Sequence, residues 1–226
     1  LEPLTCNVRT IQFGTADRAM VVAFRGIDGT EGVWYSSLQV EEIKRVIRDF
    51  LTDPARVKVG HNAGYYDAAV VKRFLGVVPA PLLDTVLVSA GVESELPHGL
   101  GFLGTYMTDV HAWKAGHAAT DARTDAELWR YGALDAVINA RIVPPLWNAL
   151  HASNQRGWYD VMRRVQDICR EMHETGMPLD EAERARWEMF YVGSSPPPPR
   201  GEFAGRIGER QRRLRDIADR PRLNPN

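Results

Sequence analysis

The sequence has few of the features that assign a chain to a specialised class. Among its 226 residues there are two cysteines, Cys6 and Cys169. They are too few and too far apart for a disulfide framework, and their spacing matches no metal-binding motif. No apolar run approaches the roughly 18 residues that a membrane span needs, and no signal peptide is visible. We therefore expect a cytoplasmic protein without a membrane partner.

Excess charge of one sign is also absent, although the charge is unevenly placed. The formal net charge is −1. Residues 1–150 carry 14 Lys and Arg against 17 Asp and Glu, whereas residues 151–226 carry 14 Arg, no Lys and 12 Asp and Glu. This balance excludes a polycation that binds nucleic acid through its overall field. Apolar residues make up 44%, which is ordinary globular composition and suits one large or two small domains.

The apolar pattern over residues 1–150 predicts an α/β domain. Three β-rich runs at 8–15, 19–26 and 32–38 predict an antiparallel meander. A short buried strand is expected at 57–63. Helical spacing predicts five helices, at 40–51, 68–75, 84–92, 100–107 and 125–150. This order of elements predicts a mixed β-sheet flanked by helices.

The pattern changes after residue 150, and we expect a helical segment over 151–226. A helix at 161–173 should end before Gly176, a common terminating residue. The proline-rich run 194–201 predicts a polyproline-type spacer, because each proline lacks an N–H group. An Arg-rich helix is expected at 206–218. Its arginines could contact a duplex backbone or form a solvated face, and both interpretations stay open.

Three aspartates stand where chemistry is feasible. Asp67 and Asp84 each open a predicted helix, and Asp135 follows Tyr131 by four residues inside the long one. That spacing places the Tyr131 hydroxyl and the Asp135 carboxylate on one helix face. Aspartate at a helix start is usually a cap, and this interpretation is retained for Asp84. For Asp67 the cap interpretation is weaker, because His61 and Asn62 precede it at an expected sheet edge. Asp135 is either an exposed helix residue or a half-buried carboxylate that needs a partner, and a divalent cation such as Mg²⁺, which prefers carboxylate oxygen, is one such partner.

Two motifs resemble those of the proofreading 3′–5′ exonucleases. "HNAGYYDAAVVKRF" is similar to the second motif of that family, with Asn62, Tyr66 and Asp67 at the matching positions. "YGALDAV" is similar to the third motif, with Tyr131 and Asp135. "PLLDTVLVSAG" between them resembles the Asp-Thr helix of the family. The resemblance covers residues 1–150 and implies an RNase H-like fold of the DEDDy type.

Later segments resemble family-A DNA polymerases. "CREMHETGMPLDEA" is similar to the passage from exonuclease to polymerase domain, and "RLNPN" to a stretch behind the thumb helices. They imply the proofreading region of a phage-like polymerase, in a bacterial or phage-infected cell. The Asp-x-Glu of the first family motif has no match, since "LEPLTCNVRTIQFG" resembles the sequence after it. We therefore expect a fragment that lacks two of four metal-binding carboxylates, with Glu2 not replacing them.

The resemblance implies a mechanism with two Mg²⁺ or Mn²⁺ ions. In the intact enzyme Asp67 and Asp135 would bind these ions together with the two carboxylates of the first motif. One ion would lower the pKa of the attacking water, and the other would stabilise the departing 3′ oxygen. Tyr131 would orient that water.

Four further residues are assigned to the substrate or to its surroundings. Asn62 is expected to position the substrate strand or the loop before Asp67, and Tyr66 to stack on a 3′ base. Lys114, in "HAWKAGH", is assigned to a phosphate contact, and the alternative of a solvated lysine beside a packed tryptophan stays open. His61 is expected to satisfy backbone or side-chain groups as a structural hydrogen-bonding residue rather than to act as a base.

The predicted activity is removal of nucleotides from single-stranded 3′ ends of DNA, at a primer–template, by a monomer. Two alternatives stay open. One is a DNA-binding module with an exonuclease fold and no metals. The other is an RNase D-like exonuclease that trims RNA.

Overall fold

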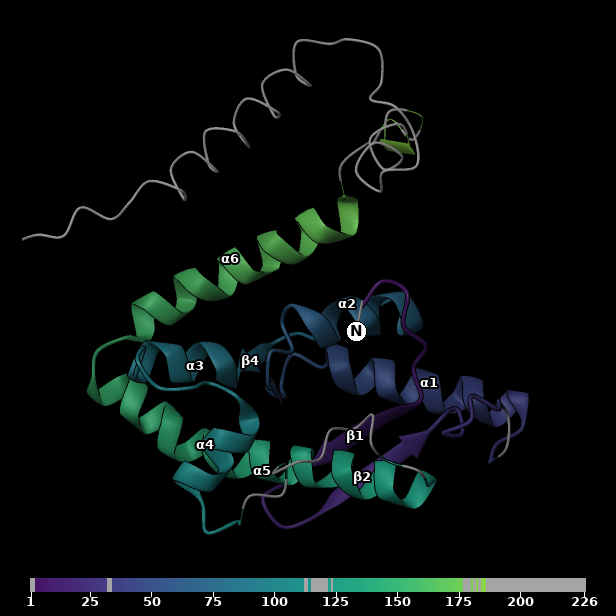
Figure 1. The fold of residues 1–226 in the computed structure, drawn as a ribbon, viewed down its shortest axis with the longest axis horizontal. Helices are drawn as coiled ribbons and strands as arrows, with labels where there is room; N and C mark the ends of the chain where they lie inside the picture. Colours follow the sequence, from purple (N-terminus) through teal and green to yellow (C-terminus); the bar gives the residue numbers. More distant parts are fainter. Residues whose placement is uncertain are drawn as a thin grey trace, which may run out of the picture. The chain divides into compact units, whose positions relative to one another are not determined.

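The computed structural model describes residues 3–31, 34–111, 114, 122, 124–176, 180, 182 and 184–185 (Figure 1). The chain divides into two compact units, Leu1–Thr175 and Gly176–Asn226. All helices and strands named below belong to the first unit. The expected proline-rich spacer and Arg-rich helix lie outside the described residues. The expected domain boundary near residue 150 stays a prediction.

The first unit begins with two strands, continues with strands separated by helices, and ends with consecutive helices (Figure 1). In chain order the elements are β1 (Thr10–Gly14), β2 (Ala19–Ala23), α1 (Ser37–Thr52), β3 (Lys58–Gly60), α2 (Tyr66–Leu75), β4 (Leu82–Asp84), α3 (Thr85–Val92), α4 (Leu100–Met107), α5 (Asp125–Ala152) and α6 (Arg156–Thr175).

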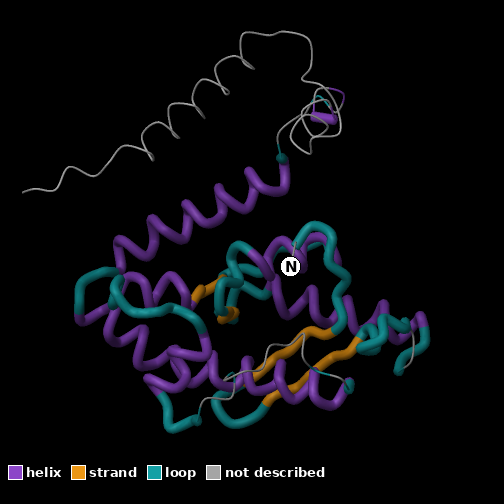
Figure 2. Tube along the Cα trace, in the orientation of Figure 1, coloured by secondary structure: helices purple, strands orange, loops and turns teal. Residues whose placement is uncertain are grey.

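The predicted α/β class is confirmed, with the strands arranged in two small sheets (Figure 2). β1 pairs antiparallel with β2, from Thr10 opposite Ala23 to Gly14 opposite Ala19. β3 pairs parallel with β4. The sequence did not predict β4, because a strand of three residues leaves too short a pattern to recognise. Within the described residues β1 and β3 each have one strand neighbour, so each has an edge without a partner strand. Residues of both strands line the cavity described below.

The third strand expected at 32–38 is wrong over its described part, residues 34–38. Ser36 caps α1, because its hydroxyl accepts a hydrogen bond from the Gln39 N–H while the Gln39 side chain accepts one from the Ser36 N–H. This reciprocal capping box satisfies two helix-end donors and starts the helix one residue later. Local capping therefore outweighs the β-propensity of the preceding aromatic residues.

α5 is the central helix of the larger hydrophobic core. It buries Ile138, Ile142, Leu146 and Leu150 almost completely. α3 and α4 pack against it, and β1 and β2 also contact it. α6 closes this core through Tyr159, which is 5% exposed. These contacts hold α5 in place, so the position of its polar face relative to both sheets is fixed.

A second, smaller core lies under α1 and α2. Its buried members are Val22, Ile47, Leu51 and Leu75. The helices predicted at 40–51, 68–75, 84–92, 100–107, 125–150 and 161–173 are confirmed; α3 begins one residue later than expected, at Thr85, and each of the others matches or extends the expected range. Gly176 follows α6 with φ of +67°, a left-handed conformation that glycine adopts readily. None of the described helices is long and apolar enough to cross a bilayer.

Gly14→Ala is expected to lower the free energy of unfolding by about 1–3 kcal/mol, because the added methyl overpacks the β1–α5 contact. A Cβ on Gly14 would lie 2.9 Å from the Cβ and 3.0 Å from the carbonyl carbon of Ala136. Urea unfolding checks this value. Gly157→Ala is the matched control, since a Cβ there meets nothing within 4 Å. An equal change in both variants would contradict the close approach.

Candidate active site

A cavity of about 1050 Å³ lies between the two sheets. Residues of β1 and β3 line it, together with residues of α2 and α5. Four of the sequence-predicted site residues line this cavity, although they are distant in the chain: Asn62, Asp67, Lys114 and Asp135. Tyr66 and Tyr131 are not part of the lining.

Asp67 stands in the first turn of α2 and faces the cavity. The residue is exposed there, but the surrounding protein desolvates its carboxyl group. The pKa of Asp67 is raised to about 6, mainly by desolvation and also by the charge of Asp84, while a hydrogen bond from its own backbone opposes the rise. Among the described residues, no cationic side chain forms an ion pair with this carboxylate.

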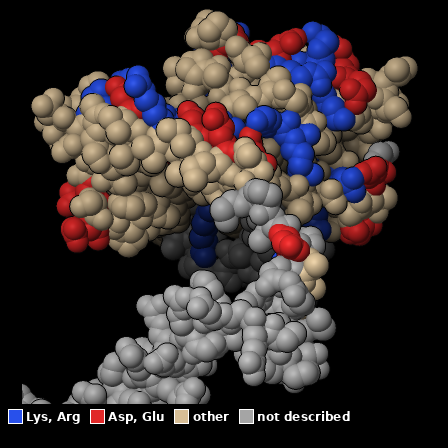
Figure 3. Space-filling model, turned by 90° about the horizontal axis from the view of Figure 1, so that it is seen from above, with Lys and Arg blue, Asp and Glu red and all other residues tan. Residues whose placement is uncertain are grey.

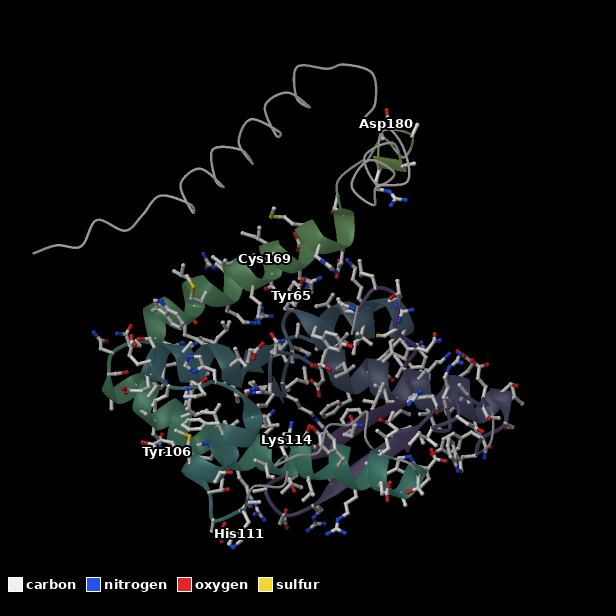
Figure 4. The ribbon with its side chains drawn as sticks, in the orientation of Figure 1. Tyr65, Tyr106, His111, Lys114, Cys169 and Asp180 are labelled. Atoms are coloured by element: carbon white, nitrogen blue, oxygen red, sulfur yellow. The ribbon has the colours of Figure 1, made fainter. Side chains whose placement is uncertain are left out.

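Asp135 lies on the face of α5 that borders the cavity, and Lys114 is its partner. The Lys114 Nζ is 3.0 Å from the Asp135 Oδ2, with both side chains 28% exposed. The same ammonium lies 5.2 Å from the ring centroid of Tyr131, one helical turn before Asp135. Figure 4 shows Lys114 beside α5. The predicted pairing of Tyr131 and Asp135 on one helix face thus brings both side chains to the same lysine.

The loop before Asp67 is fastened by Asp84. The Asp84 Oδ1 accepts from the Asn62 N–H at 2.8 Å, and its Oδ2 accepts from the Gly64 N–H at 2.9 Å. Asn62 has φ of +59°, which asparagine tolerates better than most residues. Asp84 is fully buried and also caps α3 through the Val86 N–H. The capping interpretation of Asp84 is confirmed, and the carboxylate in addition holds the loop of a candidate metal ligand.

The other donor to Asp84 comes from α6, which sequence reasoning assigned to a separate segment. The Gln166 Nε2 donates to the Asp84 Oδ2 at 2.7 Å, and the Asp84 N–H donates to the Tyr159 hydroxyl at 3.1 Å. Gly64 leaves room for this helix, because a Cβ there would lie 2.0 Å from the Gln166 Oε1. α6 and the loop of residues 61–65 are therefore in direct contact.

A buried polar chain joins three elements behind the cavity. The His61 Nδ1 is 2.9 Å from the Thr85 Oγ1, and that hydroxyl donates to the Asn139 Oδ1 at 2.8 Å. Desolvation lowers the pKa of His61 to about 4, against an opposing effect of Asp84. The hydrogen bond with Thr85 agrees with the expected structural role of His61, which stays a prediction. Thr85 and Asn139 were missed, since no local motif marks a contact 54 residues apart.

The two adjacent tyrosines face away from the cavity lining. The Tyr65 ring lies 5.6 Å from the His173 ring on α6. The Tyr66 hydroxyl donates to the Cys6 Sγ at 3.8 Å. Stacking of Tyr66 on a 3′ base stays a prediction, and this geometry does not favour it.

The carboxylates at the cavity have features that a divalent cation requires. Asp67 and Asp135 supply carboxylate oxygens from two walls of one cavity, and Asp67 has no neutralising partner among the described residues. These features fit a hard cation such as Mg²⁺. Within the described part of the chain, no group of three or more His, Cys, Asp or Glu residues is placed to bind a metal. The described residues therefore fit as part of a ligand set.

Comparisons with known proteins identify the family and the fold. A family model described as "3′–5′ exonuclease", and named for family-A DNA polymerases, matches residues 8–151. The match ends at the last turn of α5 and does not include α6 or the second unit. No curated protein matches the sequence.

Solved nuclease structures share the fold. An apo form of a nuclease superimposes with a TM-score of 0.61 and 22% identity, covering 78% of this chain and 80% of that one. NrnC of Brucella melitensis with bound Mg²⁺ gives 0.59 and 20% identity, covering 78% and 81%. NrnC bound to pGG gives 0.50 and 19%, covering 74% and 83%. At these identities the likeness extends to the fold alone.

Proposed function

Because the chain belongs to the 3′–5′ exonuclease domain family, we propose that it removes nucleotides from the 3′ ends of short single-stranded RNA with the help of Mg²⁺. The observation that carries the proposal is the shared cavity of Asp67 and Asp135, one of them without a neutralising partner among the described residues. The RNase D-like alternative is proposed ahead of the proofreading of DNA because of the structural neighbours, not because of the cavity. We further propose that the protein acts as a monomer in the cytoplasm.

In this proposal Asp67 and Asp135 hold the cation. When bound, Mg²⁺ lowers the pKa of water and stabilises negative charge on phosphate oxygens. Tyr131 orients the attacking water through its hydroxyl, from the helical turn before Asp135. Asn62 lies on the cavity wall and positions the 3′-terminal nucleotide. His61 is neutral near pH 7 and holds the loop in place without taking a proton.

The surface charge suits a substrate that binds inside the cavity better than one that binds across the protein surface. On the face drawn in Figure 3, basic and acidic side chains lie next to each other. With a net charge of −1, no broad positive field draws a long nucleic acid to the protein. A short substrate, recognised by its terminal phosphates inside the cavity, suits this distribution.

The preference for RNA is supported by a structural neighbour. NrnC, which shares the fold, has been solved with Mg²⁺ and with pGG, a nucleotide ligand. DNA proofreading is the second candidate, and it is supported by the name of the matched family and by the polymerase-like residues after 151. No structural neighbour described above is a polymerase.

The proposal is tested with 5′-labelled RNA and DNA strands of identical sequence, two to ten nucleotides long. We expect a ladder of 3′-shortened RNA products in Mg²⁺, no products in EDTA, and a slower ladder with DNA. Faster trimming of DNA would favour proofreading. Trimming that persists in EDTA, or none in any metal when the protein is folded, would contradict the proposal.

Tyr131→Phe is expected to slow trimming by about 10- to 100-fold while leaving the fold intact, because only the hydroxyl that orients water is removed. The phenylalanine ring can still face the Lys114 ammonium. Single-turnover rates and melting temperature measure the two effects separately. Tyr106→Phe is the control, since Tyr106 is 65% exposed on α4 and, unlike Tyr131, does not lie beside Lys114 one helical turn from Asp135. A normal rate in Tyr131→Phe would remove this residue from the mechanism.

A further inference from the structure

Lys114 is held at Asp135 by three contacts at once. Its ammonium forms the 3.0 Å ion pair with the Asp135 Oδ2. The ammonium also lies over the Tyr131 ring. Its aliphatic chain packs against α4, where a Cβ on Gly101 would meet the Lys114 Cβ and Cδ at 3.3 Å. The lysine head is thus directed at one of the two carboxylates that fit a divalent cation.

This arrangement conflicts with simultaneous metal binding. A divalent cation at Asp135 would approach a carboxylate oxygen that already faces an ammonium. Two cations at one oxygen repel each other strongly, the more so where solvent is partly excluded. Both side chains are 28% exposed, so solvent screens this repulsion incompletely. Lys114 must therefore leave the Asp135 Oδ2 before a cation can bind that oxygen, and its charge competes with a cation for the carboxylate as a whole.

We propose that Lys114 is an exchangeable counter-ion, which neutralises Asp135 in the metal-free protein and moves to a substrate phosphate when a divalent cation takes its place. This inference rests on the proposed function. A lysine has four rotatable stem bonds and a compact charge, so its head moves without displacing the helices. The cavity that contains Lys114 and Asp135 is large enough for a nucleotide.

If Lys114 exchanges in this way, removing its ammonium should change the affinity for the metal and the affinity for the nucleotide in opposite directions. Removing the ammonium removes a competitor of the metal, so metal affinity should rise. It also removes a phosphate contact, so nucleotide affinity should fall. Damage to the fold would weaken both ligands together. Opposite changes in the two affinities would therefore show that Lys114 competes with the metal and contacts the phosphate, and does not merely support the fold.

The test compares wild type with Lys114→Met, which keeps an unbranched chain for packing on α4 and Tyr131. Mn²⁺ binding is titrated calorimetrically without nucleic acid. We expect Lys114→Met to bind Mn²⁺ at least about fivefold more tightly than wild type, since the loss of one partly exposed ion pair is of that order. With saturating Mn²⁺, its affinity for a nucleoside 5′-monophosphate should fall about fivefold or more.

Two control variants accompany the test. Lys72→Met removes the same charge from α2, where Lys72 pairs with Glu174 outside the cavity lining. Its Mn²⁺ affinity should stay within about twofold of wild type. Lys114→Arg keeps the charge and should bind Mn²⁺ no more tightly than wild type.

Unchanged or weaker Mn²⁺ binding by Lys114→Met would overturn the proposal, as would the absence of Mn²⁺ binding in both proteins. Nucleotide affinity that does not fall would overturn its second half. A failure of the proposed function looks different. In that case Lys114→Met still tightens Mn²⁺ binding, but wild type trims neither RNA nor DNA in any metal.

Discussion

Replacing Asp84 with alanine is expected to lower the free energy of unfolding by about 3–5 kcal/mol, the largest stability effect at the site. The carboxylate is fully buried. It accepts four hydrogen bonds, three from backbone N–H groups and one from a side-chain amide, and the substitution leaves all four donors without this acceptor. These donors are Asn62 N, Gly64 N, Val86 N and Gln166 Nε2. Urea unfolding of both proteins measures the difference.

Two further substitutions identify the cause of this loss. Asp84→Asn keeps the shape but replaces one acceptor oxygen with a donor, so it should cost about 2–4 kcal/mol. Asp49→Ala is the control, because Asp49 forms an exposed ion pair with Arg45 and should change stability by less than about 1 kcal/mol. If Asp84→Ala unfolds at the same urea concentration as Asp49→Ala, the hydrogen-bonded carboxylate does not organise the loop.

The Asp84 contacts also explain why α6 belongs with the elements that precede it. The family match ends at residue 151, yet the compact unit continues to Thr175. Tyr159 and Gln166 reach the same aspartate that fixes the loop before Asp67. A shortened chain that ends with α5 would lose a hydrophobic contact and two hydrogen bonds with Asp84. We therefore expect α6 to be needed for a correctly placed Asp67.

Most of the helices could be predicted from the sequence because their apolar spacing and caps are local. α5 begins with a capping box at Thr124 and Glu127, and α6 ends at a left-handed glycine. The strands were harder to predict. A residue range with high β-propensity became the start of α1 through Ser36, and β4 has only three residues. Short strands depend on their partners, which the sequence does not specify.

At the candidate site, too, some features could be predicted from the sequence and others could not. Asp67 and Asp135 were predicted from short motifs, and the fold places both on one cavity. The ion pair of Lys114 with Asp135 joins residues 21 apart, and the bond of Gln166 with Asp84 joins residues 82 apart. Contacts of this kind arise from packing of whole elements. A local motif identified the carboxylates but not the groups that neutralise or position them.

Asp135→Ala is expected to reduce trimming by at least about 1000-fold, the largest effect on activity, because it removes one of two carboxylates proposed to hold the cation. The loss corresponds to roughly 4 kcal/mol of transition-state stabilisation. The fold should survive, since the Asp135 side chain is partly exposed and its ion pair with Lys114 contributes about 1 kcal/mol or less. Single-turnover trimming of a 5′-labelled RNA, with melting temperature measured in parallel, checks both statements.

The variant must also separate loss of metal from loss of structure. Asp135→Ala should bind Mn²⁺ more weakly than wild type, whereas Lys114→Met, at the other end of the same ion pair, should bind it more tightly. Asp160→Ala removes a carboxylate from an exposed pair on α6 and should leave rate and Mn²⁺ affinity unchanged. If Asp135→Ala trims RNA at the wild-type rate, Asp135 does not hold the catalytic cation. The cavity would then need a different set of ligands, with Asp67 as the only carboxylate retained from the present assignment.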